Sequence, residues 1–379
     1  MALLVLLHRA GFRLLAATVD HGLRPESEAE AQGVAVLCER LGIPHQVLRW
    51  QKPSQSGNLQ MAAREARISL LSGWAKAHGL GHIALGHTLD DQGETVLMRL
   101  ARGSGVDGLA GMAVKRCKGG LCWHRPLLEV GREALRDFLR EEGVVWVEDP
   151  SNEDMGYHRV KARRALGILE SLGLDAARLA QTAKHMRRAR EALEDMTIRL
   201  ARECVSITVA GELRLGDLSS ASREVQLRLL AGALQWVSSA PYRPRFAALE
   251  ALLDFGLSGK KTGRTLHGCA LRFTDHGIVI NREPAATPAC GPVVSLWDGR
   301  WEISEMPEKT AQIRALGEDG LSCIPDWRES GHSRAALLPS PSFWQGSKLI
   351  AAPLAGFGDF GGVKLALDQK GFYEALMTH

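Results

Sequence analysis

The chain has 379 residues, of which 45% are hydrophobic and 24% are charged, the usual proportions for a soluble globular protein. This length exceeds what one compact core usually holds, so we expect two or three domains. A formal net charge of +4 does not by itself indicate a nucleic-acid partner, and no stretch is long and apolar enough to span a membrane.

Residues 1 to about 150 alternate between helical and strand patterns. The patterns predict helices over 1–9, 27–41, 59–78 and 90–102, and strands over 13–19, 44–50 and 82–85. Strands separated by helices imply a parallel sheet with crossover helices, that is, an α/β fold. Ligands of such sheets bind beyond the carboxyl ends of the strands, where Asp20-His21 and the run from Gly86 to Asp91 both fall.

The sequence changes character near residue 149. It becomes rich in Arg and Ala and predicts helices as far as residue 256, followed by short β runs at 265–273, 277–281 and 293–303. We therefore expect a catalytic α/β domain over 1–160, a basic helical domain over 161–256 and a small C-terminal α+β domain over 257–379.

Seven cysteines are scattered along the chain without regular spacing. An odd number of scattered cysteines predicts reduced, unpaired thiols and a cytoplasmic protein rather than a disulfide framework. Cys117 and Cys122, with His124 close by, could bind zinc. No second Cys/His pair with metal spacing accompanies them in the sequence, so we predict no metal-binding residues.

The run Gly86-His87-Thr88-Leu89-Asp90-Asp91-Gln92-Gly93-Glu94-Thr95 carries the strongest chemical signal. A strand ends before it and a helix begins near Asp90, so Asp91 and Glu94 share one helix face, with His87 beside them. Two such carboxylates can bind a divalent metal, or hold and deprotonate a substrate amine. Simple helix capping by acidic residues explains the same run equally well.

Three further clusters are weaker. Asp20 and His21 lie in a turn after a strand, and Arg64 and Arg67 share a helix face whose guanidinium groups suit phosphate or carboxylate. Arg102 precedes a Gly-rich loop that could hold a phosphate. A polar turn, surface arginines and a helix C-cap would explain the three clusters without any ligand.

A fifth cluster, after the run from Gly86 to Thr95 and the three weaker ones, is basic. After the turn Asp149-Pro150-Ser151-Asn152, nine basic residues and only two acidic ones lie between Arg159 and Arg190, a local charge of +7. Such a stretch is either a solvated helical face or a surface that binds a polyanion.

Taken in order, these clusters resemble the N-type ATP pyrophosphatase domain of bacterial tRNA(Ile)-lysidine synthetases. The resemblance covers residues 1–165 and includes Asp-His-Gly-Leu-Arg, Ala-Arg-Glu-Ala-Arg, the run from Gly86 to Thr95, Arg-Gly-Ser-Gly-Val-Asp-Gly-Leu, Arg-Pro-Leu-Leu and Asp-Pro-Ser-Asn. Weaker similarity returns at 265–269 and 348–354. The family's Ser-Gly-Gly-x-Asp-Ser phosphate loop would precede Met1, so we expect the natural product to extend upstream.

The resemblance implies a ligase that uses ATP and Mg²⁺ to join free L-lysine to the wobble cytidine of tRNA(Ile) with a CAU anticodon. The resemblance is also compatible with a homodimer. The implied catalytic residues are His87, Asp90, Asp91 and Glu94, of which Asp91 and Glu94 receive the lysine amine. The implied substrate and ATP contacts are Asp20, His21, Arg64, Arg67 and Arg102. The implied tRNA contacts are Arg159, Lys161, Arg163, Arg164, Arg187 and Arg188.

Two alternatives differ in chemistry. A tRNA-thiolating member of the same superfamily typically needs a C-x-x-C pair, and no two cysteines here have that spacing. A non-catalytic tRNA-binding remnant that lacks the ATP loop would carry the same basic stretch, and an assay of lysine incorporation separates it from the enzyme.

Overall fold

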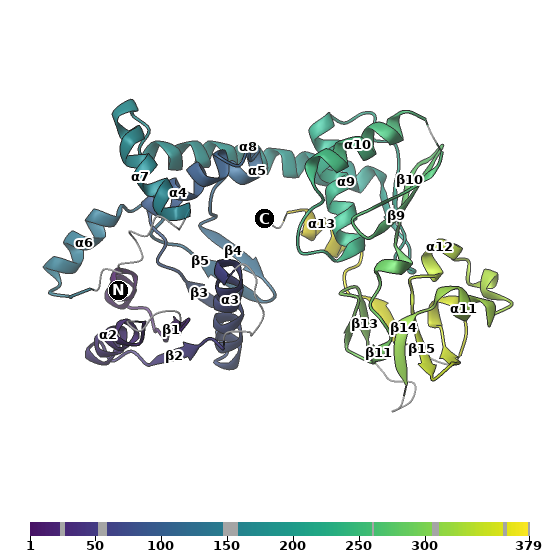
Figure 1. Cartoon of the computed structure of the whole chain (residues 1–379), viewed down its shortest axis with the longest axis horizontal. Helices are drawn as coiled ribbons and strands as arrows, with labels where there is room; N and C mark the ends of the chain where they lie inside the picture. Colours follow the sequence, from purple (N-terminus) through teal and green to yellow (C-terminus); the bar gives the residue numbers. More distant parts are fainter. Residues whose placement is uncertain are drawn as a thin grey trace. The chain divides into compact units, whose positions relative to one another are not determined.

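The computed structural model of the protein describes residues 1–22, 27–51, 59–146, 158–259, 261–304, 311–358 and 362–377. Contacts divide the chain into two compact units, Met1–Arg190 and Glu191–Thr378 (Figure 1). The predicted domain boundaries after residues 160 and 256 do not coincide with this division, and the packing of each unit explains why.

The first unit begins with alternating helices and strands. They are α1 (Ala2–Arg9), β1 (Ala16–Asp20), α2 (Ser27–Arg40), β2 (His45–Arg49), α3 (Leu59–Ala77), β3 (His82–Ala84) and α4 (Leu89–Leu100). Strands β1 and β2 pair in parallel, from Ala16 opposite His45 to Asp20 opposite Arg49. The predicted α/β fold with parallel strands is confirmed.

A second sheet of this unit has the strand order β3-β5-β4, with β3 parallel to β5 and β4 antiparallel to it. Its remaining elements are α5 (Val106–Leu109), β4 (Lys115–Lys118), β5 (Leu121–His124) and α6 (Arg132–Glu141). Leu71 and Ala75 of α3 are buried with Ile83 of β3 and Leu121 of β5, and residues of β1 and β2 pack against the same cluster. The two sheets therefore share one core.

The hairpin of β4 and β5 carries a disulfide bond between Cys117 and Cys122. The two residues face each other across the hairpin, with Cα atoms 4.0 Å apart. The prediction of unpaired thiols is wrong for this pair, because the strand register brings together two cysteines that are five positions apart in the sequence.

Helix α4 packs against α7 (His158–Leu169) and the first half of α8 (Ala176–Cys204) (Figure 1). Val96 of α4 is buried with Leu179 and Ala183 of α8. The approach is so close that a Cβ atom on Gly93 would lie 2.9 Å from the Cα atom of Ala176. Because α7 and the start of α8 pack on α4, the first unit extends to Arg190 instead of ending near residue 160.

The second unit contains a five-stranded antiparallel sheet in the order β6-β7-β10-β9-β8. Its elements are β6 (Val205–Ile207), β7 (Leu213–Leu215), α9 (Arg223–Ser238), α10 (Phe246–Leu257), β8 (Gly263–Leu266), β9 (Cys269–Thr274) and β10 (Gly277–Arg282). Leu230 of α9, Leu253 of α10 and Ile280 of β10 belong to one buried cluster. The helices and strands share this core, so a boundary at residue 256 would cut through it.

Two smaller sheets complete this unit. One contains β11 (Gly291–Pro292), β14 (Gln312–Ala315), β15 (Pro341–Gln345) and β16 (Lys348–Ala351), and the other contains β12 (Leu296–Trp297), β13 (Trp301–Ile303) and β17 (Val363–Leu365). The helices are α11 (Gly317–Ser322), α12 (Arg334–Leu337) and α13 (Gln369–Leu376).

The predicted strand over 293–303 is a hairpin instead. Asp298 and Gly299 adopt positive φ angles of 53° and 65°, which reverse the chain between β12 and β13. Among the helices of the described ranges, none has the length and apolar character needed to cross a bilayer.

Candidate active site

The N-terminus of α4 lies directly after the loop that follows β3. Thr88 is the N-cap residue, and its backbone N–H donates to Oδ2 of Asp91 over 2.8 Å while its Oγ1 accepts from the Asp91 backbone N–H over 3.3 Å. This reciprocal capping box satisfies backbone groups that helix ends otherwise leave unpaired. Capping therefore accounts for Asp91 Oδ2 and leaves Oδ1 for other partners.

Glu94 lies one turn further along α4 and its side chain is only 1% exposed. Arg159 Nε lies 3.0 Å from Oε2 and Arg163 Nε lies 2.8 Å from Oε1. Arg132 contributes a third guanidinium group, 3.7 Å from Glu94 and 3.8 Å from Asp91. Asp91 and Glu94, the acidic pair, thus lie together on one face of α4 under three arginines.

Asp90 points to a different element. Its Oδ2 accepts a hydrogen bond of 2.7 Å from the backbone N–H of Arg132, the first residue of α6. A carboxylate at a helix N-terminus satisfies an unpaired donor and is favoured by the helix dipole. Asp90 therefore positions Arg132, a residue that the sequence analysis missed although it closely follows the Arg-Pro-Leu-Leu motif.

Two histidines of the predicted clusters have environments that disfavour their charged form. Burial lowers the pKa of His87 to about 4, with Arg125, Arg159 and Arg67 adding to the effect and Asp91 opposing it. Burial and then Arg67 lower the pKa of His21. The positive charge of Arg67 therefore disfavours protonation of both histidines.

Asp20 is held within its own turn. Its Oδ1 accepts from the Gly22 backbone N–H over 2.9 Å and from Ser27 Oγ over 2.8 Å, and these bonds lower the pKa of the carboxyl. Asp20 is the last residue of β1, one position beyond the predicted strand end, and its partners are Gly22 and the first residue of α2, Ser27.

Several further arginines influence one another electrostatically. We call Arg64, Arg67, Arg99, Arg102 and Arg125 the arginine cluster. Burial is the main cause that lowers the pKa of Arg67, Arg99 and Arg125, and the charge of Arg64 lowers all three further. Like charges held this close suit a ligand with several negative charges, such as a polyphosphate.

The Gly-rich loop between α4 and β4 is fixed by side chains of helices. Arg99 donates to the Gly108 and Gly111 carbonyl oxygens over 2.7 and 3.1 Å. Gln92 bonds both backbone groups of Met112, accepting over 2.7 Å and donating over 3.0 Å. A Cβ atom on Gly111, which has a φ of +66°, would lie 2.8 Å from the Gln92 amide. The loop is therefore packed against α4.

The predicted tRNA contacts separate into two groups. Lys161, Arg164 and Arg188 are exposed. Arg159 and Arg163 turn toward Glu94, and Arg187 donates to the Met112 carbonyl oxygen over 2.8 Å. The structure therefore uses Arg159, Arg163 and Arg187 to hold α4 and the loop, and leaves Lys161, Arg164 and Arg188 exposed.

Some motif residues lie outside the described ranges, namely Leu23, Arg24 and the Asp149-Pro150-Ser151-Asn152 turn. Among the described residues, no group of three or more His, Cys, Asp and Glu side chains could hold a metal ion. The carboxylates of the site are instead bonded to arginines and backbone donors.

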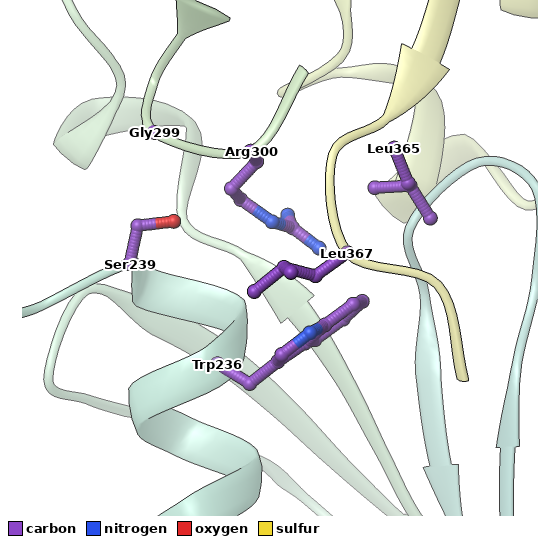
Figure 2. A pocket seen from close by; sticks show the side chains of 6 residues that line it. All are labelled: Trp236, Ser239, Gly299, Arg300, Leu365 and Leu367. Carbon is purple, nitrogen blue, oxygen red and sulfur yellow. The ribbon is translucent and has the colours of Figure 1, made fainter. Parts of the chain in front are cut away.

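A small pocket lies in the second unit, lined by Trp236, Ser239, Gly299, Arg300, Leu365 and Leu367 (Figure 2). Arg300 is buried, lies 5.1 Å from the Trp236 ring centre and donates to the Gly211 carbonyl oxygen over 2.7 Å. These contacts tie α9 to β13, and no predicted site residue lines the pocket.

Comparison with known proteins shows the family of the chain. A protein-family model described as a PP-loop domain matches residues 1–169. A tRNA(Ile)-lysidine synthase of Ruegeria pomeroyi is 44% identical over 98% of this chain and 88% of its own length. Proteins of the same name from Wolbachia pipientis and a Methylobacterium species are 32% and 41% identical over 89% and 71% of this chain, and 81% and 78% of their own lengths.

The chain belongs to the tRNA(Ile)-lysidine synthase family. The resemblance found in the sequence motifs is thereby confirmed. The matched PP-loop domain of this family member contains the acidic pair, the arginine cluster and α7, whereas Arg187 and Arg188 lie beyond it. The PP-loop domain also assigns the chain to proteins that use ATP.

Proposed function

We propose that this chain is a tRNA(Ile)-lysidine synthase, a ligase that forms a carbon–nitrogen bond. ATP first adenylates the C2 oxygen of the wobble cytidine in tRNA(Ile) with a CAU anticodon, and pyrophosphate leaves. The ε-amine of free lysine then bonds to C2, the amine loses a proton, and AMP leaves with the C2 oxygen. The acidic pair at the N-terminus of α4, in a chain 44% identical to a protein of that name, carries the proposal.

The acidic pair suits the amine step. Lysine arrives as an ammonium ion, and it must lose a proton before it can attack C2. Asp91 Oδ1 and Glu94 offer carboxylate oxygens on one helix face, which can hold the ammonium ion by charge-assisted hydrogen bonds and accept its proton. We assign Asp91 and Glu94 to the lysine amine on this basis.

The arginine cluster suits the nucleotide step. Guanidinium groups bind phosphate oxygens in pairs, so Arg64, Arg67 and Arg102 are assigned to ATP or to the anticodon nucleotide. Neutral His87 can exchange hydrogen bonds with the adenylate without adding positive charge. Magnesium would enter with the triphosphate, because this ion usually keeps ligands from phosphate and water.

The exposed part of the basic stretch suits the tRNA. Lys161, Arg164 and Arg188 are exposed on α7 and α8, where each could contact a backbone phosphate. Such contacts release counterions, so tRNA affinity should fall steeply with salt. A tRNA substrate also places the reaction in the cytoplasm.

The experiment is incorporation of labelled lysine into a tRNA(Ile) transcript with a CAU anticodon. We expect incorporation to require ATP and to release one AMP and one pyrophosphate for each lysine. A transcript with uridine in place of the wobble cytidine is the matched control and should accept no lysine. If the protein binds the transcript but incorporates no lysine, the enzyme proposal fails and the non-catalytic alternative holds.

A further inference from the structure

The acidic pair is covered by positive charge. Three guanidinium groups, those of Arg132, Arg159 and Arg163, face two carboxylates. The local formal charge is therefore +1. Glu94 is 1% exposed, so its oxygens are inaccessible from solvent while the arginines keep these positions.

This arrangement opposes entry of an amine. An ammonium ion approaching the acidic pair meets a net positive charge and finds Glu94 already bonded over 2.8 and 3.0 Å. Like charges repel most strongly where solvent screening is weak. Lysine can take its place on Glu94 only when at least one guanidinium group has left.

The three arginines differ in how firmly they are held. Arg132 begins α6, and its backbone N–H is bonded to Asp90, so its position is tied to a helix end. Arg159 and Arg163 are four residues apart on α7, and their side chains remain 43% and 35% exposed. Because they are partly exposed at the end of long, flexible side chains, an anion from solvent can reach them without unfolding the helix.

The neighbouring residues indicate which anion. Arg159 and Arg163, four residues apart, share one face of α7, whereas Lys161 and Arg164, three residues apart, share a different and exposed face. A single phosphate needs one or two guanidinium groups, whereas basic residues on two faces of one helix fit a polyanion that passes along it with successive phosphates. An RNA backbone lying along α7 would therefore compete with Glu94 for Arg159 and Arg163.

We propose that Arg159 and Arg163 form a removable arginine cover over the acidic pair, and that tRNA phosphates draw the cover away so that lysine binds after tRNA. The exchange is charge for charge, because an ammonium ion replaces a guanidinium group on Glu94. Arg159 and Arg163 are thus positioning residues that make lysine affinity depend on bound tRNA. This inference rests on the proposed function and adds an order of binding to it.

The first test measures lysine affinity by equilibrium dialysis with labelled lysine and the full chain. The three arms are the protein alone, the protein with saturating tRNA(Ile), and the protein with a non-hydrolysable ATP analogue. We expect tRNA to tighten lysine binding roughly tenfold or more, within the usual range of coupling between two sites. Equal affinity with and without tRNA overturns the proposal, and so does tightening by the ATP analogue alone.

The second test removes the cover. Arg163→Gln should raise lysine affinity in the absence of tRNA by roughly tenfold and reduce the effect of tRNA by the same factor, since coupling is reciprocal. Arg178→Gln is the matched control, because it removes the same charge at an exposed position of α8 to which no ligand is assigned. It should leave tRNA-free lysine affinity unchanged.

A purely structural role for Arg163 gives a different result. Arg163→Gln would then lower the melting temperature without raising lysine affinity, and that outcome overturns the proposal. If Arg163→Gln does not fold, Arg159→Gln provides the same comparison at the more exposed member of the cover. Lysine incorporation by the wild type, combined with tRNA-independent lysine affinity, rejects the cover and keeps the proposed function. Absence of incorporation rejects both.

Discussion

Two buried glutamates, one in each unit, are satisfied in different ways. Glu94 in the first unit is 1% exposed and is bonded to guanidinium groups on neighbouring helices. Glu212 in the second unit is 3% exposed and has one arginine partner, Arg214, at 2.7 Å.

The other partners of Glu212 are neutral. Ser333 Oγ donates over 2.6 Å and Asn281 Nδ2 donates over 3.3 Å, from the N-cap of α12 and from β10. Short neutral side chains on fixed elements cannot be exchanged for a soluble ligand, whereas long cationic side chains can be exchanged for another cation. This difference in partners indicates that Glu212 stabilises the fold. It also fits the proposal that Glu94 binds a substrate.

The largest expected effect comes from Glu94→Gln. Loss of one carboxylate leaves three guanidinium groups facing Asp91 alone, which removes both the ammonium site and a proton acceptor. Lysine incorporation should fall by about 100-fold or more, the usual scale for general acid–base groups. Glu133→Gln, which removes an exposed carboxylate of α6, is the control and should retain activity. Near-normal incorporation by Glu94→Gln would contradict the assignment.

Glu212→Gln should show the reverse pattern. Its amide cannot accept from all three donors, so the free energy of unfolding should fall by about 1–3 kcal/mol, as for other broken buried hydrogen bonds. Lysine incorporation per folded molecule should stay unchanged. Urea denaturation measures the free energy of unfolding, and a separate incorporation assay at low temperature measures the activity of the folded protein. Asp254→Asn, at an exposed position, is the control for both measurements. A large loss of activity without loss of stability would reverse the roles given to the two glutamates.

Acid should affect the first unit earlier. Burial holds the pKa of His87 near 4 in the folded protein, below its usual value of 6.5. The unfolded chain therefore binds a proton first, and stability is lost as pH falls from 6.5 toward 4. His87→Gln should flatten this slope in denaturation measured at several pH values. Exposed His185→Gln on α8 is the control, and an unchanged slope in His87→Gln would refute the explanation.

The second unit should respond only at lower pH. Burial raises the pKa of Glu212, but hydrogen bonds from Ser333, Arg214 and Asn281 lower it by more. The net result is a pKa below its usual value of 4.5. The stabilisation is therefore complete above that value and is lost as pH falls through the depressed pKa. The stability difference between the wild type and Glu212→Gln should shrink below about pH 4.5. A difference that stays constant to pH 3 would contradict this small effect.

Local patterns predicted the α/β order, the start of α4 and the shared face of Asp91 and Glu94, because capping and helical spacing are properties of adjacent residues. The partners of Glu94 could not be predicted in this way. Which face of α7 turns toward α4 depends on how the helices pack, so Arg159 and Arg163 were expected at the tRNA.

The same limit explains the other differences. Pairing of Cys117 with Cys122 depends on the register of a hairpin that the sequence does not specify, and the chain reversal at Asp298-Gly299 depends on backbone angles. Arg132 joins the site through a hydrogen bond to Asp90, 42 residues away in the sequence. Each missed feature is a contact between segments that are separated along the chain or paired by register.

Gln92 and Arg99 attach the Gly-rich loop to α4. The Gln92 amide bonds the N–H and the carbonyl oxygen of Met112 as a neighbouring strand would, and Arg99 on the same helix bonds two more carbonyl oxygens of the loop. The loop is thus attached to α4 at two points, one and eight residues beyond Asp91. Any tilt of α4 would therefore move the acidic pair and the loop together.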